Sequence, residues 1–303
     1  MPNPSELPEP AAPTSTTSAP ATEDGRPLTA GVAMLATAVA VISLLVGGLL
    51  TLVNMTGHVF GAWPSPDSLS QGLVGAAMLG TAPALFTVNR ARLWQQARTL
   101  LYPLAVVLVG LFLVSLLDAD RLYLATGGNI VPVLFSLGWL LTLGALTIAA
   151  AVLLTWQHLT PATPLAASTA PLPGWSKPAL AVLGSSWLGI GAGLVTRPGF
   201  WADFVPWSTN RLDAQALGVW ALALGVGILG ALAEDDLDRT RPALLALPGA
   251  GAAVTLVLAF RAPGVDWSSG PALGLVCMVG GLFLAGASGR VLLARASAVT
   301  RGT

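Results

Sequence analysis

The sequence feature that most constrains the fold is a long stretch without charge at residues 30–53, which reads AGVAMLATAVAVISLLVGGLLTLV. A helix of about 20 apolar residues crosses the roughly 30 Å of hydrocarbon in a bilayer. Backbone polar groups in lipid must be satisfied internally, and a helix does this within one segment. We therefore predict that this stretch is a transmembrane helix.

Similar apolar stretches recur along the chain. Only 9% of the residues are charged and 54% are hydrophobic, whereas about a quarter of a typical soluble domain is charged. None of the stretches has an ionisable residue near its centre, which argues against a proton-coupled transporter. The eight predicted spans are residues 30–53, 72–88, 100–117, 130–155, 178–196, 215–232, 243–260 and 271–293. Six spans with two buried or re-entrant segments are the alternative.

The arginines and lysines predict the orientation. With the N-terminus in the cytoplasm, ten of the 14 cationic side chains fall in inner segments and four in outer loops. Inner loops carry this excess in most multi-pass proteins. The sequence therefore predicts a protein of the bacterial cytoplasmic membrane with both termini inside. The inner set is Arg26, Arg90, Arg92, Arg98, Lys177, Arg239, Arg241, Arg290, Arg295 and Arg301.

The predicted organisation is two membrane units joined by a linker. Residues 1–28 are rich in Pro, Ser and Thr and lack large apolar clusters, so we expect a disordered cytoplasmic tail. The first four-helix unit covers residues 29–158, a cytoplasmic linker covers 159–177, and the second unit covers 178–295. Residues 296–303 form a second cytoplasmic tail.

Two similar segments indicate that the units are copies. The segment WPSPDSLSQGLVGAA at residues 63–77 and the segment PWSTNRLDAQALGVW at 206–220 align at an offset of 143. This offset places Leu69 on Leu212 and Gly75 on Gly218, and the order of spans and loops recurs. Four spans per unit is an even number, so the copies are parallel repeats about an axis along the membrane normal. The predicted fold class is thus an all-α polytopic bundle of about eight spans in two parallel four-helix repeats.

Glycines and alanines spaced four apart, as in GLVGAAMLG at residues 72–80, indicate close helix packing. The helix start at residues 69–76, the basic segment 90–98 and the acidic segment 118–121 resemble a repeated pattern in uncharacterised multi-pass bacterial integral membrane proteins. That pattern has a helix start of the type LxxxFLGA, a basic inner loop and an outer acidic end with an arginine. The resemblance implies a membrane bundle with a duplicated four-helix unit and brings no known activity.

The candidate site residues lie in the predicted outer loops. Asp118, Asp120 and Arg121 end the third span, and Trp63 and Trp207 lie in the first outer loop of each unit. We predict that these five residues form an outward-facing ligand site. The alternative is that the carboxylates are ordinary loop residues and that the tryptophans are anchors whose rings lie among lipid headgroups with their N–H groups in water.

The sequence predicts neither a metal nor a cofactor. Cys277 is the only cysteine, the two histidines have no partner at a metal-binding spacing, and no nucleotide-binding or hydrolase motif occurs. The acidic segment EDDLDR at residues 234–239 reads as a solvated turn, with a cation or partner site as the alternative. The net charge of zero argues against nucleic acid as a partner.

The leading functional expectation is a non-enzymatic scaffold or accessory subunit of a membrane complex. Its expected partners are membrane lipids and other membrane protein subunits. The alternative is a transporter or channel for a small or lipid-like substrate, which the duplicated architecture favours. A membrane-embedded enzyme ranks third, because the available acids and bases lie in loops.

Overall fold

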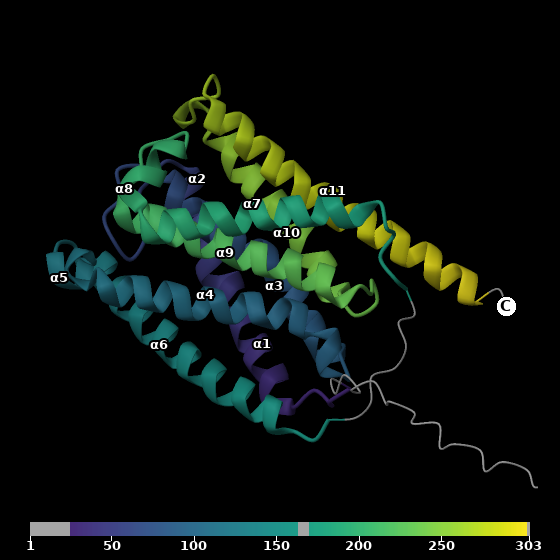
Figure 1. Cartoon of the computed structure of the whole chain (residues 1–303). Helices are drawn as coiled ribbons and strands as arrows, with labels where there is room; N and C mark the ends of the chain where they lie inside the picture. Colours follow the sequence, from purple (N-terminus) through teal and green to yellow (C-terminus); the bar gives the residue numbers. More distant parts are fainter. Residues whose placement is uncertain (1–24, 163–169, 302–303) are drawn as a thin grey trace, which may run out of the picture.

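A computed structural model describes residues 25–162 and 170–301 of the chain, and its regular structure in these ranges is helical, with no strand longer than an isolated bridge. Eight helices are long and apolar enough to cross a membrane, as predicted. Figure 1 shows them gathered into one bundle. The protein is therefore an integral membrane protein of the multi-pass type. The spans are Ala30–Met55, Leu69–Arg90, Arg98–Leu117, Ile130–Leu159, Ser176–Thr196, Arg211–Glu234, Arg241–Phe260 and Gly270–Arg295.

Within these spans the helices have clear bounds. They are α1 (Ala30–Ile42), α2 (Gly48–Met55), α3 (Leu69–Thr87), α4 (Arg98–Leu117), α6 (Ile130–Leu159), α7 (Ser176–Thr196), α9 (Arg211–Glu234), α10 (Arg241–Phe260) and α11 (Gly270–Arg301). Two short helices, α5 (Tyr123–Thr126) and α8 (Pro198–Trp201), lie in loops. A π-helical turn at Ser43–Gly47 joins α1 to α2, so these form one continuous span.

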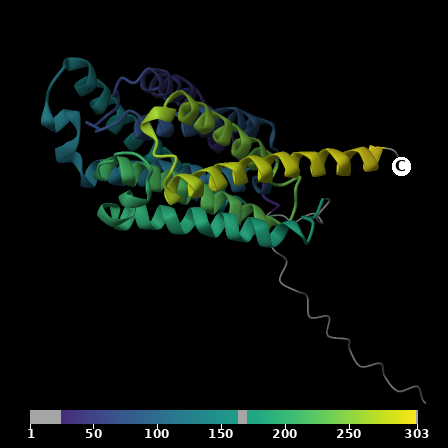
Figure 2. The same cartoon turned by 90° about the horizontal axis from the view of Figure 1, so that it is seen from above.

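The bundle has two distinct ends. We call the end where α1 begins and α11 ends the terminal end, and the opposite one the far end (Figure 1). The far end carries the loops at residues 56–68, 118–129, 197–210 and 261–269. Seen from above, α11 extends past the other helices at the terminal end (Figure 2).

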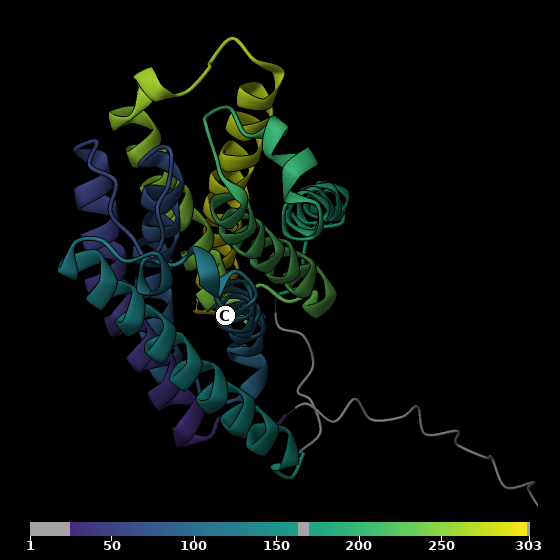
Figure 3. The ribbon, with the colours of Figure 1, turned by 90° about the vertical axis from the view of Figure 1, so that its left-hand side faces the viewer.

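Two helices form the centre of the bundle. Helix α3 packs against α1, α2 and α10, and helix α9 packs against α7 and α4. Helix α6 then lies on α4 and α1, and α11 lies on α10 (Figure 3). In the most apolar window of each span, 67% of α3 is buried but only 22% of α6 and of α7. The peripheral helices thus present most of their apolar surface to lipid.

Close glycine crossings hold the centre together, as the small-residue pattern predicts. A Cβ atom on Gly75 would lie 2.9 Å from the carbonyl oxygen of Gly47, and one on Gly218 would lie 3.0 Å from that of Gly191. Where α3 crosses α10, a Cβ on Gly80 would lie 2.4 Å from the carbonyl oxygen of Gly249. Such contacts bring helix backbones together where lipid supplies no hydrophobic drive for association.

The predicted tails and linker are only partly described. The tail prediction for residues 1–24 and the linker prediction for 163–169 lie outside the described residues. Residues 25–28 pack against the loop after α3, because Leu28 N–H donates to Arg92 O (2.9 Å) and Trp94 N–H donates to Arg26 O (2.8 Å). Helix α11 continues to Arg301, so most of the predicted second tail is helical.

Candidate functional site

The loops that enter α3 and α9 cross at the far end. The indole Nε1 of Trp63 donates to Asp213 Oδ1 (2.8 Å), and Ser65 Oγ donates to Asp213 Oδ2 (2.5 Å). Asp213 lies in the first turn of α9 and is fully buried. A loop from the first four spans therefore ends on a carboxylate from the last four.

A matching set of contacts runs in the other direction. The indole Nε1 of Trp207 donates to Ser70 Oγ in the first turn of α3 (2.9 Å), and Asn210 Nδ2 donates to Pro64 O (2.7 Å). Ser70 and Asp213 are 143 residues apart, the offset at which the two sequence segments align. We call residues 63–70 and 206–213 the crossed loops.

Local sequence explains why α9 begins where it does. Asn210 Oδ1 accepts from the Asp213 N–H (2.8 Å) and Asp213 Oδ2 accepts from the Asn210 N–H (3.3 Å), so the two form a capping box. At α3, Asp67 Oδ1 accepts from the Leu69 N–H (2.8 Å). The Asp213 carboxylate thus serves its own helix start and the loop of the other half together.

A second buried carboxylate adjoins the crossed loops. Asp118 is 3% exposed, and its Oδ1 lies 3.3 Å from Arg121 Nε and 3.3 Å from Arg211 Nε. Its Oδ2 is buried and has no hydrogen-bond partner among the described residues. Arg211 begins α9, so this ion pair ties the end of α4 to the same helix start that Trp63 contacts.

The structure brings four of the five predicted site residues to this cluster. Trp63, Trp207, Asp118 and Arg121 lie around the start of α9 or of α3, whereas Asp120 is exposed, and no ion pair is found for it in the described ranges. Trp63 is only 4% exposed and its N–H bonds to protein. The alternative of a wet interfacial anchor is therefore wrong for Trp63.

A large apolar cavity lies below the crossed loops. It has a volume of about 590 Å³ and is bounded by α3, α7, α9, α10 and α11. Its walls are almost entirely carbon, and three aromatic residues, Trp201, Phe204 and Trp207, line it near the far end. We call it the larger cavity.

A smaller cavity of about 240 Å³ lies between α1, α3, α4 and α6. Trp220 of α9 lines both cavities, so one indole ring forms part of each wall. Trp139 narrows the smaller one, held by an N–H bond to Ser115 Oγ (3.2 Å) and by an edge contact with Trp63 (ring centroids 6.1 Å apart).

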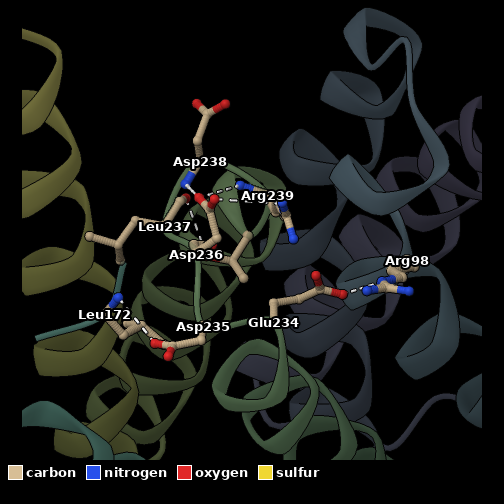
Figure 4. Close-up of polar contacts among 9 residues, drawn as sticks. Arg98, Leu172, Glu234, Asp235, Asp236, Leu237, Asp238 and Arg239 are labelled. Carbon is tan, nitrogen blue, oxygen red and sulfur yellow. Dashed lines mark hydrogen bonds and ion pairs between the residues drawn. The ribbon is translucent and has the colours of Figure 1, made fainter. Parts of the chain in front are cut away.

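The acidic segment after α9 is engaged in local pairs (Figure 4). Glu234 pairs with Arg98, Asp235 accepts from Lys177 Nζ (2.6 Å) and from the Leu172 N–H (3.2 Å), and Asp236 accepts from the Asp238 N–H (2.8 Å). The hydrogen bond and charge of Lys177, with the Leu172 N–H, lower the pKa of Asp235. Among the described residues, no group of three or more acids, histidines or cysteines could hold a metal ion.

No protein-family model, no curated protein and no solved structure matches the chain.

Sequence reasoning missed Asp213, Ser70 and Arg211 as members of the far-end cluster. The signal was present, because the offset of 143 aligns Ser70 with Asp213 at equivalent helix starts. It carried no information on which loop each residue would contact.

Proposed function

We propose that this integral membrane protein binds a lipid-like, predominantly apolar molecule drawn from the bilayer. The observation that carries the proposal is the larger cavity, about 590 Å³ in volume, whose lining comes from the first four spans at α3 and from the last four at α7, α9, α10 and α11. Its volume lies within the roughly 300–1,000 Å³ of typical small-molecule sites.

The lining selects an apolar occupant. A polar molecule would lose its hydrogen bonds to water and find few replacements on these walls. Apolar cavities of this kind also stay dry rather than fill with water. An acyl or isoprenoid chain gives up no hydrogen bonds on entry, because it exchanges one hydrocarbon environment for another.

The route of entry lies between α7 and α11. These helices meet where a Cβ on Gly281 would lie 2.7 Å from Leu183 Cδ1. The cavity lies further toward the far end, lined by Ile190 of α7 and Gly274 of α11. The aromatic residues Trp201 and Phe204, whose ring centroids are 5.5 Å apart, line the far-end rim of the cavity. Aromatic residues of this kind are common at the membrane–water interface.

We include in this proposal that the two halves are parallel copies of one four-helix unit, with the terminal end in the cytoplasm. Three features support the duplication: the reciprocal contacts of the crossed loops, the glycine crossings at Gly75 and Gly218, and the paired cavities. The excess of arginine at the terminal end supports the orientation.

Photolabelling tests the proposed function. The full-length protein is reconstituted with phosphatidylethanolamine that carries a diazirine on one acyl chain, and labelled peptides are identified by mass spectrometry. Gly274→Leu places a side chain in the cavity where a Cβ would meet nothing within 4 Å. We expect labelling of α7 and α9 peptides in the wild type and a loss of at least half of it in this variant.

The matched control is Gly280→Leu, also on α11 and also in open space, but outside the cavity lining. Labelling of the cavity peptides in this variant should equal that of the wild type. Labelling spread evenly over all lipid-facing helices, or an equal loss in both variants, would contradict the proposal.

The scaffold function remains a second candidate, and one observation favours it. Gly189 on α7 and Gly280 on α11 face open space on helices that are mostly unburied. Small residues on such faces allow close approach of a helix from another subunit. Native mass spectrometry after extraction in mild detergent tests this: a stoichiometric protein partner lost in Gly189→Leu supports it, and a lone chain contradicts it.

A further inference from the structure

A basic, concave site lies at the terminal end, away from both apolar cavities. It has a volume of about 460 Å³ and lies between the end of the second span, the start of α10 and residues 290–294 of α11. Arg90, Arg241 and Arg290 line it, one from each of these segments, and Asp238 is the one acidic residue in the lining. The lining thus carries a formal excess of two positive charges.

These arginines differ from the paired cationic residues near them. Within residues 25–162 and 170–301, no ion pair is found for any of the three. By contrast, the acidic segment neutralises three neighbouring cations, in the pairs Arg98–Glu234, Lys177–Asp235 and Arg239–Asp236. Figure 4 shows the Asp238 side chain directed away from the other acidic side chains of this segment. Among the described residues, the site therefore keeps an excess of positive charge that no ion pair neutralises.

The start of α10 adds to the positive potential. This helix of 20 residues begins without a side-chain cap, although its Arg241 N–H donates to Asp238 O (3.4 Å) and Pro242 has no N–H. The aligned peptide dipoles of a helix give its start a partial positive charge that favours anions. Arg241 and Pro242 both line the site, so the helix end and the arginines act on the same space.

One wall of the site is apolar. Leu244, Leu245 and Leu293 lie beside the arginines and continue toward the membrane-spanning parts of α10 and α11. A ligand that fits both surfaces has an anionic head and an apolar tail. Arginine binds phosphate oxygens through paired N–H groups, and basic pockets between membrane helices bind anionic headgroups.

We infer that this site binds the phosphate group of an anionic phospholipid. The inference goes beyond the proposed function, since it concerns other residues, the opposite end of the bundle and a charged rather than an apolar group. Inorganic phosphate shares the recognised chemistry, so the experiment must separate the two sources.

The test uses the full-length protein in mixed micelles, with lipid adducts counted by native mass spectrometry. Phosphatidylglycerol and phosphatidylcholine of the same acyl chains are added in equal amounts. The variant Arg90→Gln/Arg241→Gln/Arg290→Gln removes the three charges. Arg92→Gln/Arg295→Gln is the control, because these arginines lie at the same end outside the lining. We expect the wild type and the control to prefer phosphatidylglycerol by roughly tenfold or more, and the triple variant to lose this preference.

Further arms make the result decisive. Asp238→Asn removes the opposing charge and should raise phosphatidylglycerol retention about fivefold, which tests the site without risk to the fold. Displacement of the lipid by millimolar inorganic phosphate would support a site for the phosphate group itself, and no displacement would support a lipid that needs its acyl chains.

Equal binding of the two lipids by the wild type, or a preference that survives in a folded triple variant, would overturn the inference. Gly274→Leu should leave this preference unchanged, so failure of the apolar site and failure of the basic site can be told apart.

Discussion

The two apolar cavities differ in size, and in the proposed duplication two equivalent positions of their linings carry side chains of different size. At the offset of 143, two aromatic residues that line the smaller but not the larger cavity align with two non-aromatic residues of the larger cavity. These pairs are Phe135 with Met278 and Trp139 with Leu282. The smaller cavity measures about 240 Å³ and the larger about 590 Å³. Under the proposed duplication, one helix arrangement thus leaves a smaller space in the first half and a larger one in the second.

This comparison separates what the backbone supplies from what the side chains supply. In the proposed duplication, equivalent helix crossings leave a gap in each half, and the side chains at two positions, aromatic in one half and not in the other, accompany the difference in volume. A filled gap stabilises the bundle through dispersion contacts, whereas an open one forgoes them. We therefore expect the first half to contribute rigidity and the second to hold the ligand.

The largest expected effect comes from opening the smaller cavity. Trp139→Ala removes a ring that is 7% exposed together with its bond to Ser115, and should lower the free energy of unfolding by about 3–5 kcal/mol. The measurement is unfolding by SDS titration in mixed micelles. Photolabelling by the diazirine lipid should then appear on α4 and α6 peptides.

Trp156→Ala is the control for this change, because Trp156 lies on the same helix and is 69% exposed. It should alter the unfolding free energy by less than about 1 kcal/mol. A Trp139→Ala protein that gains no label on α4 and α6 would break the comparison between the cavities.

The crossed loops give the second-largest effect. Here the stronger acceptor, the Asp213 carboxylate, belongs to the second half of the chain. Asp213→Ala removes the acceptor of Trp63 and Ser65 and half of a capping box, and should cost about 3 kcal/mol of unfolding free energy. Ser70→Ala removes a single neutral acceptor for Trp207 and should cost about 1 kcal/mol. Equal losses of unfolding free energy in the two variants would show that the Asp213 carboxylate stabilises the protein no more than the Ser70 hydroxyl does.

The third effect concerns the crossing of α3 and α10. A Cβ on Gly249 would lie 2.2 Å from Gly80 O, so Gly249→Ala should destabilise the bundle by about 1–3 kcal/mol. The residues at the offset of 143 are Val106 and Ala223, so the proposed duplication pairs this glycine crossing with two positions that carry side chains. Gly280→Ala, in open space, should be neutral within about 0.5 kcal/mol when unfolded in parallel. A neutral Gly249→Ala would mean that the tight crossing is dispensable.

The smallest effect is a pH dependence at the terminal end. The lowered pKa of Asp235 means that its pairing with Lys177 contributes stability above the unfolded pKa, near 4, and that this is lost as the pH falls through the folded value. Both side chains are partly exposed, so salt screens the pair. We expect Lys177→Met to weaken the pH dependence of the unfolding midpoint as the pH falls through and below the unfolded pKa of Asp235. An unchanged profile would assign the acid sensitivity to other carboxylates.

The sequence predicted the spans well and their contacts poorly, for a physical reason. Run length and hydropathy report directly on the ability of a helix to cross the hydrocarbon layer, which is why the sequence predicts the eight spans found in the described residues. The role of Asp213 depends on a loop 150 residues away, and that information lies in the packing of the helices. The cavities depend on the space that five helices leave between them, and no local pattern encodes it. The sequence also does not reveal whether the Trp63 N–H faces water or donates to a buried acceptor, because that too depends on how distant helices pack.

The crossed loops also set an order of events during synthesis. Trp63 is made 150 residues before its acceptor Asp213, a delay of roughly 8–30 s at the usual rates of translation. Until then the ring has no carboxylate partner, and we expect it to rest at the membrane surface with its N–H in water. The Trp63 ring would then anchor the growing chain at the membrane surface. In the finished protein the same ring is buried and links the first four spans to the last four through Asp213.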